Sequence, residues 1–237
     1  LVPEPIVSEE GNLLSYEKVN FIVKNSEKGA GADKASGLSS GPANIYTSGM
    51  DGTLDNNFVI SYQLGDLSKQ KSGRYKSRIQ YFWEEAGAQT KIDSLELVIV
   101  NQRIFDLIAS PQDQKYAIEF RDLKPSAQPK ASEVILEVKT NIGKPYQISQ
   151  EISSELVNKE GQKIASKYFT FHTENIDSQG ILKFTEQQEV KNGDIILFTS
   201  DNQGAPAKIK VVYELSIPLD VRAGDYSANV TYSILEI

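Results

Sequence analysis

Two stretches of this chain decide the predicted fold: SGRYKSRIQYFWEEA at 72–86 and AGDYSANVTYSILEI at 223–237. They align without a gap, and the constant offset places Tyr75 opposite Tyr226 and Ile79 opposite Val230. In both stretches apolar and polar residues alternate, which is typical of a half-buried β-strand. The chain therefore contains the same strand twice, and this is the first sign of an internal repeat.

The repeat extends upstream of this strand. NFVISYQLGDLSKQ at 57–70 matches KIKVVYELSIPLDV at 208–221, and IVSEEGNLLSYEKVNFIVKN at 6–25 matches LVNKEGQKIASKYFTFHTEN at 156–175. Short strands separated by turn residues, with no long segment of helical spacing, predict an all-β fold. We expect two tandem immunoglobulin-like antiparallel β-sandwich domains, with a jelly roll as the alternative for each copy.

The two copies differ in length. The sequence predicts a first domain at 1–86, a connector at 87–94 and a second domain at 95–237. The second domain opens with three strand-like runs, LELVIVNQRIFDLIA, KYAIEF and SEVILEVKT, whose counterparts in the first copy would precede Leu1. The first domain is therefore expected to lack its N-terminal strands. Three explanations stay open: earlier residues of a longer protein, a strand from a neighbouring subunit, or a smaller domain.

A missing strand has a large energetic consequence. Three or four inward apolar side chains, at roughly 1.5 to 3 kcal/mol each, sum to about 5 to 10 kcal/mol. This is comparable with the total stability of a typical domain, about 5 to 15 kcal/mol. The open sheet edge would also attract another strand. The candidate residues of such an assembly groove are Leu13, Val19, Phe21, Tyr75 and Ile79.

The glycine that precedes each repeated tyrosine has a structural interpretation. Gly73 and Gly224 stand where the last strand begins, and glycine permits a bend or a positive φ there. The tyrosine two residues later can pack its ring on the core while its hydroxyl reaches a backbone group. We therefore expect Gly73, Tyr75, Gly224 and Tyr226 to define the fold, not to contact a ligand.

Composition excludes several classes of function. The chain has 32 acidic and 25 basic residues and a formal charge of −7, which argues against a nucleic-acid partner. It has no cysteine, so neither a disulfide nor a cysteine zinc site can form. Its apolar runs are too short to span a bilayer. The sequence predicts no cofactor, no metal site and no membrane span.

The residues that could support catalysis do not form a recognisable site. The single histidine, His172, is expected on the solvent side of its strand. Glu84 and Glu85 are consecutive, so in a strand they point to opposite faces. The turns at 51–56 and 201–202 carry Asp and Asn that could hold Ca²⁺, but hairpin turn chemistry also explains them. We therefore predict that the protein is not an enzyme.

An aromatic cluster ends the first copy. Tyr81, Phe82 and Trp83 are consecutive, so at least one of them is expected to face solvent. Sugars stack on exposed aromatic rings, which makes Tyr81 and Trp83 the candidate glycan-binding residues. The alternative is that the cluster seals a contact between the domains.

The closing motif, glycine, any residue, tyrosine and then alternating apolar positions, occurs at 73–81 and at 224–232. It resembles the terminal strand of subunits in the spore-coat-U and archaic chaperone–usher pilin group. The resemblance covers only this strand in each copy, and many exported β-sandwiches end in a similar way. The chain departs from the group in having no cysteines and in its tandem arrangement.

This resemblance implies a secreted, fibre-forming or adhesive role without catalysis. The predicted function is a non-enzymatic structural or adhesive protein, outside the cell or on its surface. It would be a pilus or surface-filament subunit that pairs strands with copies of itself or with related subunits. The alternative is a carbohydrate-binding module, with glycans as partners, or an ancillary domain pair of a larger secreted protein.

Overall fold

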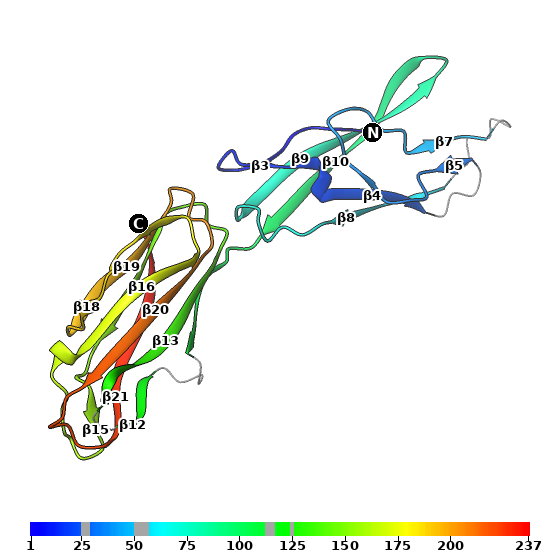
Figure 1. The fold of residues 1–237 in the computed structure, drawn as a ribbon. Coiled ribbons are helices and arrows are strands. Elements are labelled where there is room, and N and C mark those ends of the chain that lie inside the picture. The colour runs from blue at the N-terminus through cyan, green and yellow to red at the C-terminus, as the bar shows by residue number, and fades with distance from the viewer. Residues whose placement is uncertain (25–28, 50–56, 112–116, 124–125) are drawn as a thin grey trace. The chain divides into compact units, whose positions relative to one another are not determined.

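The structure, a computed structural model, describes residues 1–24, 29–49, 57–111, 117–123 and 126–237. The chain forms an all-β protein of antiparallel sheets, as the sequence predicts. It divides into two compact units, Leu1–Arg103 and Ile104–Ile237 (Figure 1). The helical elements in the described residues are two short 3-10 turns, and no helix there has the length and apolar character to cross a membrane.

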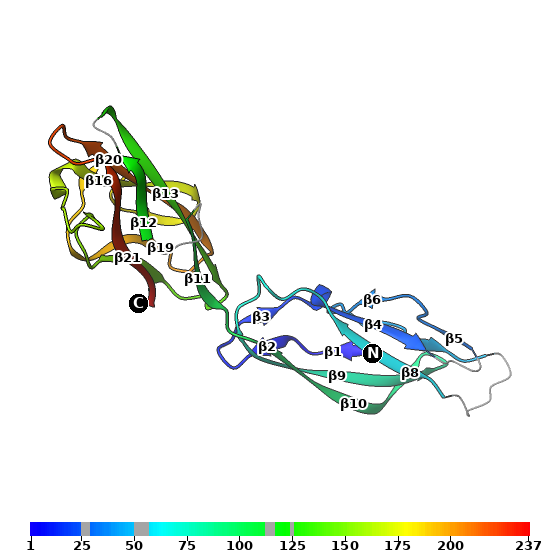
Figure 2. The same cartoon turned by 90° about the horizontal axis from the view of Figure 1, so that it is seen from below.

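The first unit is a small sandwich. Its elements are β1 (Val2–Pro3), β2 (Ile6–Ser8), β3 (Leu13–Leu14), η1 (Tyr16–Lys18), β4 (Val19–Lys24), β5 (Ala30–Gly31), β6 (Ser36–Gly37), β7 (Tyr46–Thr47), β8 (Val59–Leu64), β9 (Gly73–Glu85) and β10 (Ala88–Asn101). One sheet is built around β9, which pairs with β1, β2 and β10, while β4 lies between β6 and β8 in the other (Figure 2). The core between the sheets contains Phe21 from β4 and Ile79 from β9.

The second unit is a larger sandwich. Its elements are β11 (Phe105–Pro111), β12 (Ala117–Leu123), β13 (Ser126–Thr140), β14 (Tyr146–Ile152), β15 (Val157–Asn158), η2 (Ser166–Tyr168), β16 (Phe169–Asp177), β17 (Gly180–Leu182), β18 (Gln188–Glu189), β19 (Gly193–Ser200), β20 (Ala207–Ile217) and β21 (Gly224–Glu236). One sheet has the order β11-β13-β20-β16-β18 and the other the order β12-β21-β14-β19-β17, with β15 beside β21. Leu136, Ile148 and Tyr213 are among the residues of the core between them.

The repeated sequences form the same strand pairings in both units. Phe21 of β4 pairs with Tyr62 of β8, and the corresponding Phe171 of β16 pairs with Tyr213 of β20. Similarly, β2 pairs with β9 and β15 pairs with β21 in corresponding registers. The closing strands β9 and β21 are therefore equivalent, and the two units can be compared strand by strand.

The glycine and tyrosine of the closing strand do what the sequence predicts. Gly73 and Gly224 have φ values of 148° and 154°. The ring of Tyr75 is fully buried, and its hydroxyl donates to the carbonyl oxygen of Lys71 at 2.7 Å. Tyr226 makes the equivalent bond to Arg222, at 3.1 Å. These residues fix the chain entering the closing strand in each unit.

The boundary between the units differs from the predicted one. Residues 87–94 were expected to be a connector and 95–101 to open the second domain, but Gly87 lies in a turn and Ala88–Asn101 form β10 of the first unit. This strand pairs with β9 from Glu85 to Gly73. The first domain therefore extends to Arg103, and the LELVIVNQRIFDLIA run is divided between β10 and β11.

Local backbone geometry explains why the chain turns back at this point. Ala86 and Gly87 have φ values of 50° and 83°. Positive φ at both central residues is the requirement for a type I′ hairpin turn, whose twist suits two paired strands. Beyond the turn, Ile99 lies in the core of the first unit, and Leu97 packs against that core. Ile99 and Leu97 of β10 thus contribute to the core of the first unit.

Candidate functional site

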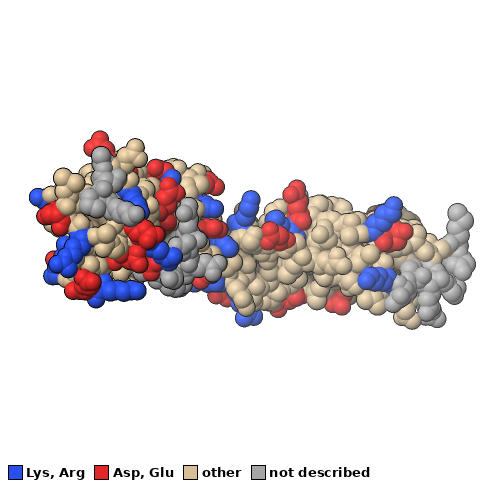
Figure 3. All heavy atoms as spheres, turned by 60° about the horizontal axis from the view of Figure 1, so that its bottom comes forward, with Lys and Arg blue, Asp and Glu red and all other residues tan. Residues whose placement is uncertain are grey.

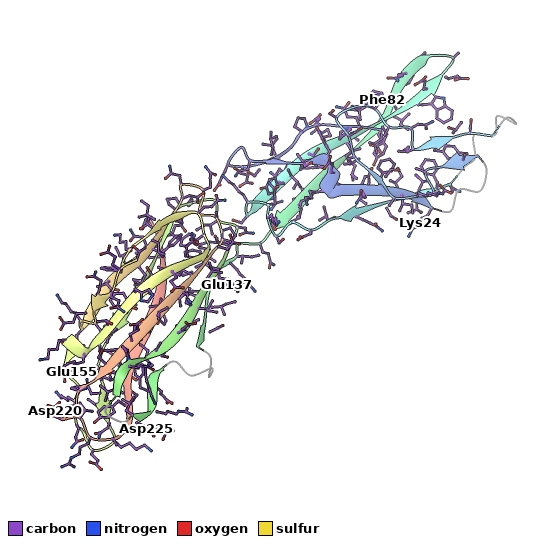
Figure 4. The ribbon with its side chains drawn as sticks, viewed as in Figure 1. Lys24, Phe82, Glu137, Glu155, Asp220 and Asp225 are labelled. Atoms are coloured by element: carbon purple, nitrogen blue, oxygen red, sulfur yellow. The ribbon has the colours of Figure 1, made fainter. Side chains whose placement is uncertain are left out.

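A groove of about 480 Å³ opens on the first unit beside the last residues of β9, near the turn that joins β9 to β10. The residues that line it come from the chain start, the segment around β7, the end of β9 and the start of β10: Leu1, Val2, Pro42, Ala43, Asn44, Ile45, Tyr46, Thr47, Ser48, Phe82, Trp83, Glu84 and Gln89. Phe82, labelled in Figure 4, marks its position on β9. The walls thus combine aromatic and aliphatic side chains with amide, hydroxyl and carboxylate groups.

One wall of the groove is a strand edge. In the described part of the chain, β9 pairs with β10 along one edge, and with β1 and β2 along the other only as far as Gln80. The backbone from Phe82 to Glu84 therefore has a strand on one side and the groove on the other. A strand edge of this kind can accept hydrogen bonds from, and donate them to, an added strand.

In the second unit, the equivalent position beside the closing strand is occupied by β14. There β14 lies between β21 and β19, and its residues Tyr146–Ser149 pair with the last residues of β21. Tyr146 and Ile148 are fully buried. The equivalent part of β9 is Phe82–Glu85, so the groove occupies the place of the first half of β14.

Leu1 lies next to this position. Val2 pairs with Gln80, so continuing the register places Leu1 beside Tyr81, as Gln150 lies beside Tyr232 in the second unit. The Leu1 nitrogen donates to the Ala43 carbonyl at 3.1 Å, and the Ala43 nitrogen donates to the Leu1 carbonyl at 2.9 Å. These two bonds close the inner end of the groove.

The groove lies away from the assembly residues proposed from the sequence. Val19, Phe21, Tyr75 and Ile79 are buried in the core of the first unit, where none of them can contact another chain. Leu13 is 68% exposed but does not line the groove. Period-two alternation correctly marks inward-facing residues, but it does not distinguish those that are already covered from those that await a partner.

The two glycan candidates have different surroundings. Trp83 lines the groove and is 39% exposed. Tyr81 does not line it, and its hydroxyl lies 2.7 Å from the hydroxyl of Tyr62. Burial raises the pKa of both hydroxyls above the usual tyrosine range. Of these two candidates, only Trp83 lines the groove, where its ring can contact a ligand.

The same hydroxyl pair exists in the second unit with one more partner. Tyr213 and Tyr232 have their hydroxyl oxygens 2.8 Å apart, and the Tyr213 hydroxyl donates to the Gln150 side-chain carbonyl at 2.6 Å. Burial raises the pKa of Tyr213 and of Tyr232. In the first unit Leu1 takes the place of Gln150, and the Tyr62 and Tyr81 hydroxyls bond to each other.

We expect Tyr213→Phe to lower the free energy of unfolding of the second unit by about 1 to 3 kcal/mol at neutral pH. Its buried partners, the Gln150 carbonyl and the Tyr232 hydroxyl, would each lose a hydrogen bond. The folded-state pKa of Tyr213 lies above the unfolded value of about 10. The stability that its neutral hydroxyl contributes is therefore fully present below about pH 10 and is lost as the pH rises further.

Calorimetry of both proteins from about pH 7 to pH 11 would test this expectation, since the difference between them should shrink above about pH 10. Tyr168→Phe, at a partly buried position on η2, is the matched control and should have a small effect. A difference that stays constant over the whole range would contradict the assignment to Tyr213.

The other chemical candidates are placed as follows. His172 is mostly covered, and its Nε2 lies 3.2 Å from a carboxylate oxygen of Glu174. Glu84 accepts a hydrogen bond from Gln89 at 3.0 Å across the hairpin, and Glu85 is exposed. Asp201 accepts from the Ala205 nitrogen at 2.9 Å, which is turn chemistry. The turn at 51–56 lies outside the described residues.

The sequence reasoning missed most of the groove. Leu1, Ala43, Tyr46 and Gln89 line it, and none of them stands in a motif. The available signal was the repeat itself, because the first half of β14 has no counterpart in the sequence of the first unit. Using that signal requires knowing that β14 lies between β19 and β21, which only the tertiary structure reveals.

Comparisons of this chain with protein-family models, with curated proteins and with solved structures found no match.

Proposed function

We propose that this protein is a non-enzymatic structural or adhesive subunit of an extracellular or cell-surface filament. In this proposal, the groove of the first unit accepts a β-strand from a neighbouring subunit. The observation that carries the proposal is the position of the groove, which is that of the first half of β14 in the second unit. The location outside the cell rests on the resemblance of the two closing strands to pilin-type subunits, and the immunoglobulin-like character of the sandwiches stays part of this proposal.

The chemistry of the groove supports a strand as its occupant. An added strand would pair its backbone with the edge at Phe82–Glu84 and would place alternate side chains over the first unit's interior. Polar groups in the groove already bond to each other: Asn44 donates to Thr47 at 3.0 Å, and Gln89 donates to Glu84. They shape the walls and leave the β9 backbone as the main hydrogen-bonding surface.

The surface charge is compatible with close association of subunits. Acidic and basic side chains are mixed over the second unit on the face that Figure 3 shows, and no single sign dominates there. The formal charge is −7. Mixed charges permit contact between copies, whereas a large field of one sign would repel an identical surface.

Sedimentation velocity and electron microscopy over a range of protein concentrations would test the proposal. Trp83 is the only tryptophan of the chain, so its fluorescence reports on the groove alone. We expect concentration-dependent assembly together with a blue shift of the Trp83 emission, because the indole becomes buried. Assembly with unchanged Trp83 emission, or no assembly at any concentration, would contradict the proposal.

The variant Trp83→Arg should abolish this assembly, because it places a charge where the incoming strand would pack. The matched control is Leu219→Arg, at a residue of the second unit that is 89% exposed. This control should assemble like the unchanged protein. Circular dichroism would establish that both variants are folded.

Glycan binding is the second candidate, favoured by the exposed face of Trp83 beside the polar groups of Asn44 and Gln89. Aromatic faces bordered by amides are suited to sugars, since the ring covers apolar C–H groups while amides bond hydroxyls. A glycan-array screen separates the two functions. Sugar binding that Trp83→Ala abolishes, without any concentration-dependent assembly, would favour the carbohydrate-binding module.

A further inference from the structure

The strand β10 forms an edge of the first unit's β9 sheet. In the described residues this 14-residue strand pairs with β9 along one side and with no strand along the other (Figure 2). Ile99 of β10 pairs with Tyr75 as Phe120 of β12 pairs with the equivalent Tyr226, and β12 is likewise the last strand of its sheet in the described part of the second unit. An edge at this position is therefore common to both copies of the repeat.

The edge strand of the second unit carries features that oppose pairing with another strand. Its buried residue Phe120 lies between Glu119 and Arg121, whose side chains form an ion pair at 2.8 Å. The register with β21 is interrupted between Phe120 and Leu123, where Asp122 has a φ of 52°. Charged side chains and irregular backbone of this kind keep an exposed edge from adding a strand.

The edge strand of the first unit has apolar residues at the matched positions. Its buried residue Ile99 lies between Val98 and Val100, which are 39% and 65% exposed. From Ser94 to Val100 the register with β9 is unbroken, and this run contains one charged residue, Glu96, and no proline. A regular and largely apolar edge of this length is open to pairing.

The residues of this edge suit a second copy of the same chain. In a two-fold contact the same strand of both subunits pairs antiparallel with itself. With Val98 on the axis, Val98 faces its own copy and Leu97 faces Ile99. Glu96 has Arg78 opposite it on β9 of its own chain, and no charged residue of the copy would face it in this register. The formal charge of −7 therefore does not oppose association at this edge.

We infer that two copies of this chain associate through β10. The two strands pair antiparallel over Leu95–Asn101 with Val98 at the two-fold axis, so that the β9 sheets of both subunits become one continuous sheet. This contact goes beyond the proposed function and does not involve the groove. It closes on itself as a dimer, whereas insertion of a strand into the groove of the next subunit can continue without limit. A contact of this small size is expected to be weak and reversible.

The test variant is Val98→Glu, compared with its parent by sedimentation velocity over a range of concentrations. Both proteins carry Trp83→Arg, so that assembly through the groove cannot contribute. Lys76 lies opposite Val98 on β9 of the same chain, so a glutamate there is compatible with the fold, but two like charges would meet at the dimer axis. We expect the parent to dimerise and Val98→Glu to raise the dissociation constant of the dimer at least tenfold.

The matched control is Ile92→Glu in the same background. Ile92 is on the same strand and is 63% exposed, but it lies in the irregularity between Lys91 and Asp93, outside the paired segment. This variant should dimerise like the parent. Circular dichroism would establish that all variants are folded.

Two further measurements locate the contact. Val98→Lys should also weaken the dimer, and an equal mixture of Val98→Glu and Val98→Lys should form a heterodimer, because opposite charges then meet at the axis. Hydrogen exchange at Leu95–Asn101 of the parent should slow as its concentration rises. Exchange at β12, the equivalent edge, should not change.

Three outcomes would overturn the inference. These are a parent that stays monomeric with constant exchange at Leu95–Asn101, a dimer that Val98→Glu does not weaken, and a mixture of the Glu and Lys variants that forms no heterodimer. Aggregates without a defined size would also exclude a closed dimer. None of these results bears on the groove, because Trp83→Arg is present throughout, so the proposed function stands or falls separately.

Discussion

Replacing Ile99 by aspartate is expected to unfold the first unit and to leave the second unit folded. Ile99 lies on β10, is 2% exposed and pairs with the fully buried Tyr75. The substitution forfeits about 1.5 to 3 kcal/mol of apolar burial. It also places a carboxyl group in the core, at a cost of several kcal/mol. Together these losses approach the total stability of a typical domain, about 5 to 15 kcal/mol.

The measurement is thermal unfolding followed by two probes. Trp83 fluorescence reports on the first unit, and calorimetry records both units. We expect the Trp83 transition to disappear in Ile99→Asp while one calorimetric transition remains. The matched control is Val100→Asp, at the next residue along the strand, which is 65% exposed and should change stability little. An unchanged Trp83 transition in Ile99→Asp would mean that β10 does not complete the first unit.

Replacing Gly204 by alanine is expected to destabilise the second unit by roughly 2 to 5 kcal/mol. Gly204 has a φ of 61°, and an added Cβ atom would lie 1.9 Å from the Lys144 carbonyl oxygen. The positive φ costs an alanine roughly 1 to 2 kcal/mol. The clash adds roughly 1 to 3 kcal/mol, because the opposing atom belongs to the backbone and cannot rotate away.

This turn matters because it positions the start of β14. The Gly204 nitrogen donates to the Asp201 carbonyl at 3.1 Å, and the Tyr146 hydroxyl donates to the Ala205 carbonyl at 2.8 Å. Moving the turn to relieve the clash would therefore disturb Tyr146, the first residue of β14. The effect should appear in the calorimetric transition of the second unit, with the Trp83 transition unchanged.

Gly161→Ala is the matched control for Gly204→Ala. Gly161 also has a positive φ, of 77°, but an added Cβ would meet no heavy atom within 4 Å. It should therefore show only the conformational cost, roughly 1 to 2 kcal/mol. Equal destabilisation by the two substitutions would show that the close approach to Lys144 has no energetic consequence.

The fold class was predictable because it depends on local patterns. The alternation in VTYSI and RIQYF, and the turn residues between such runs, identify strands without knowledge of their partners. The glycine and tyrosine that open each closing strand were also predictable, since their role involves residues only a few positions apart, such as Tyr75 and Lys71.

The domain boundary was not predictable in the same way. The run LELVIV at 95–100 is equally suited to the core of either unit, because an apolar alternating strand fits any half-buried edge. Its assignment to the first unit depends on the turn at Ala86–Gly87, where alanine adopts a positive φ that its type rarely allows. Because alanine is not a typical residue for such a turn, the sequence did not indicate a hairpin here, and a connector was predicted instead.

The candidate site shows the same limit. Trp83 was identified from the sequence, because an aromatic cluster at a strand end must expose part of itself. Ala43 and Gln89 were not identified, since each reaches the groove from a segment distant in sequence.

The sequence by itself determined that this protein is built from β-strands and that its closing strand occurs twice. Side-chain alternation and turn chemistry are properties of neighbouring residues, so they can be read without coordinates. Only the tertiary structure decided that β10 belongs to the first unit and that the groove lies beside the end of β9. Both depend on which distant strand lies against an edge, and backbone hydrogen bonds along an edge are the same for every sequence.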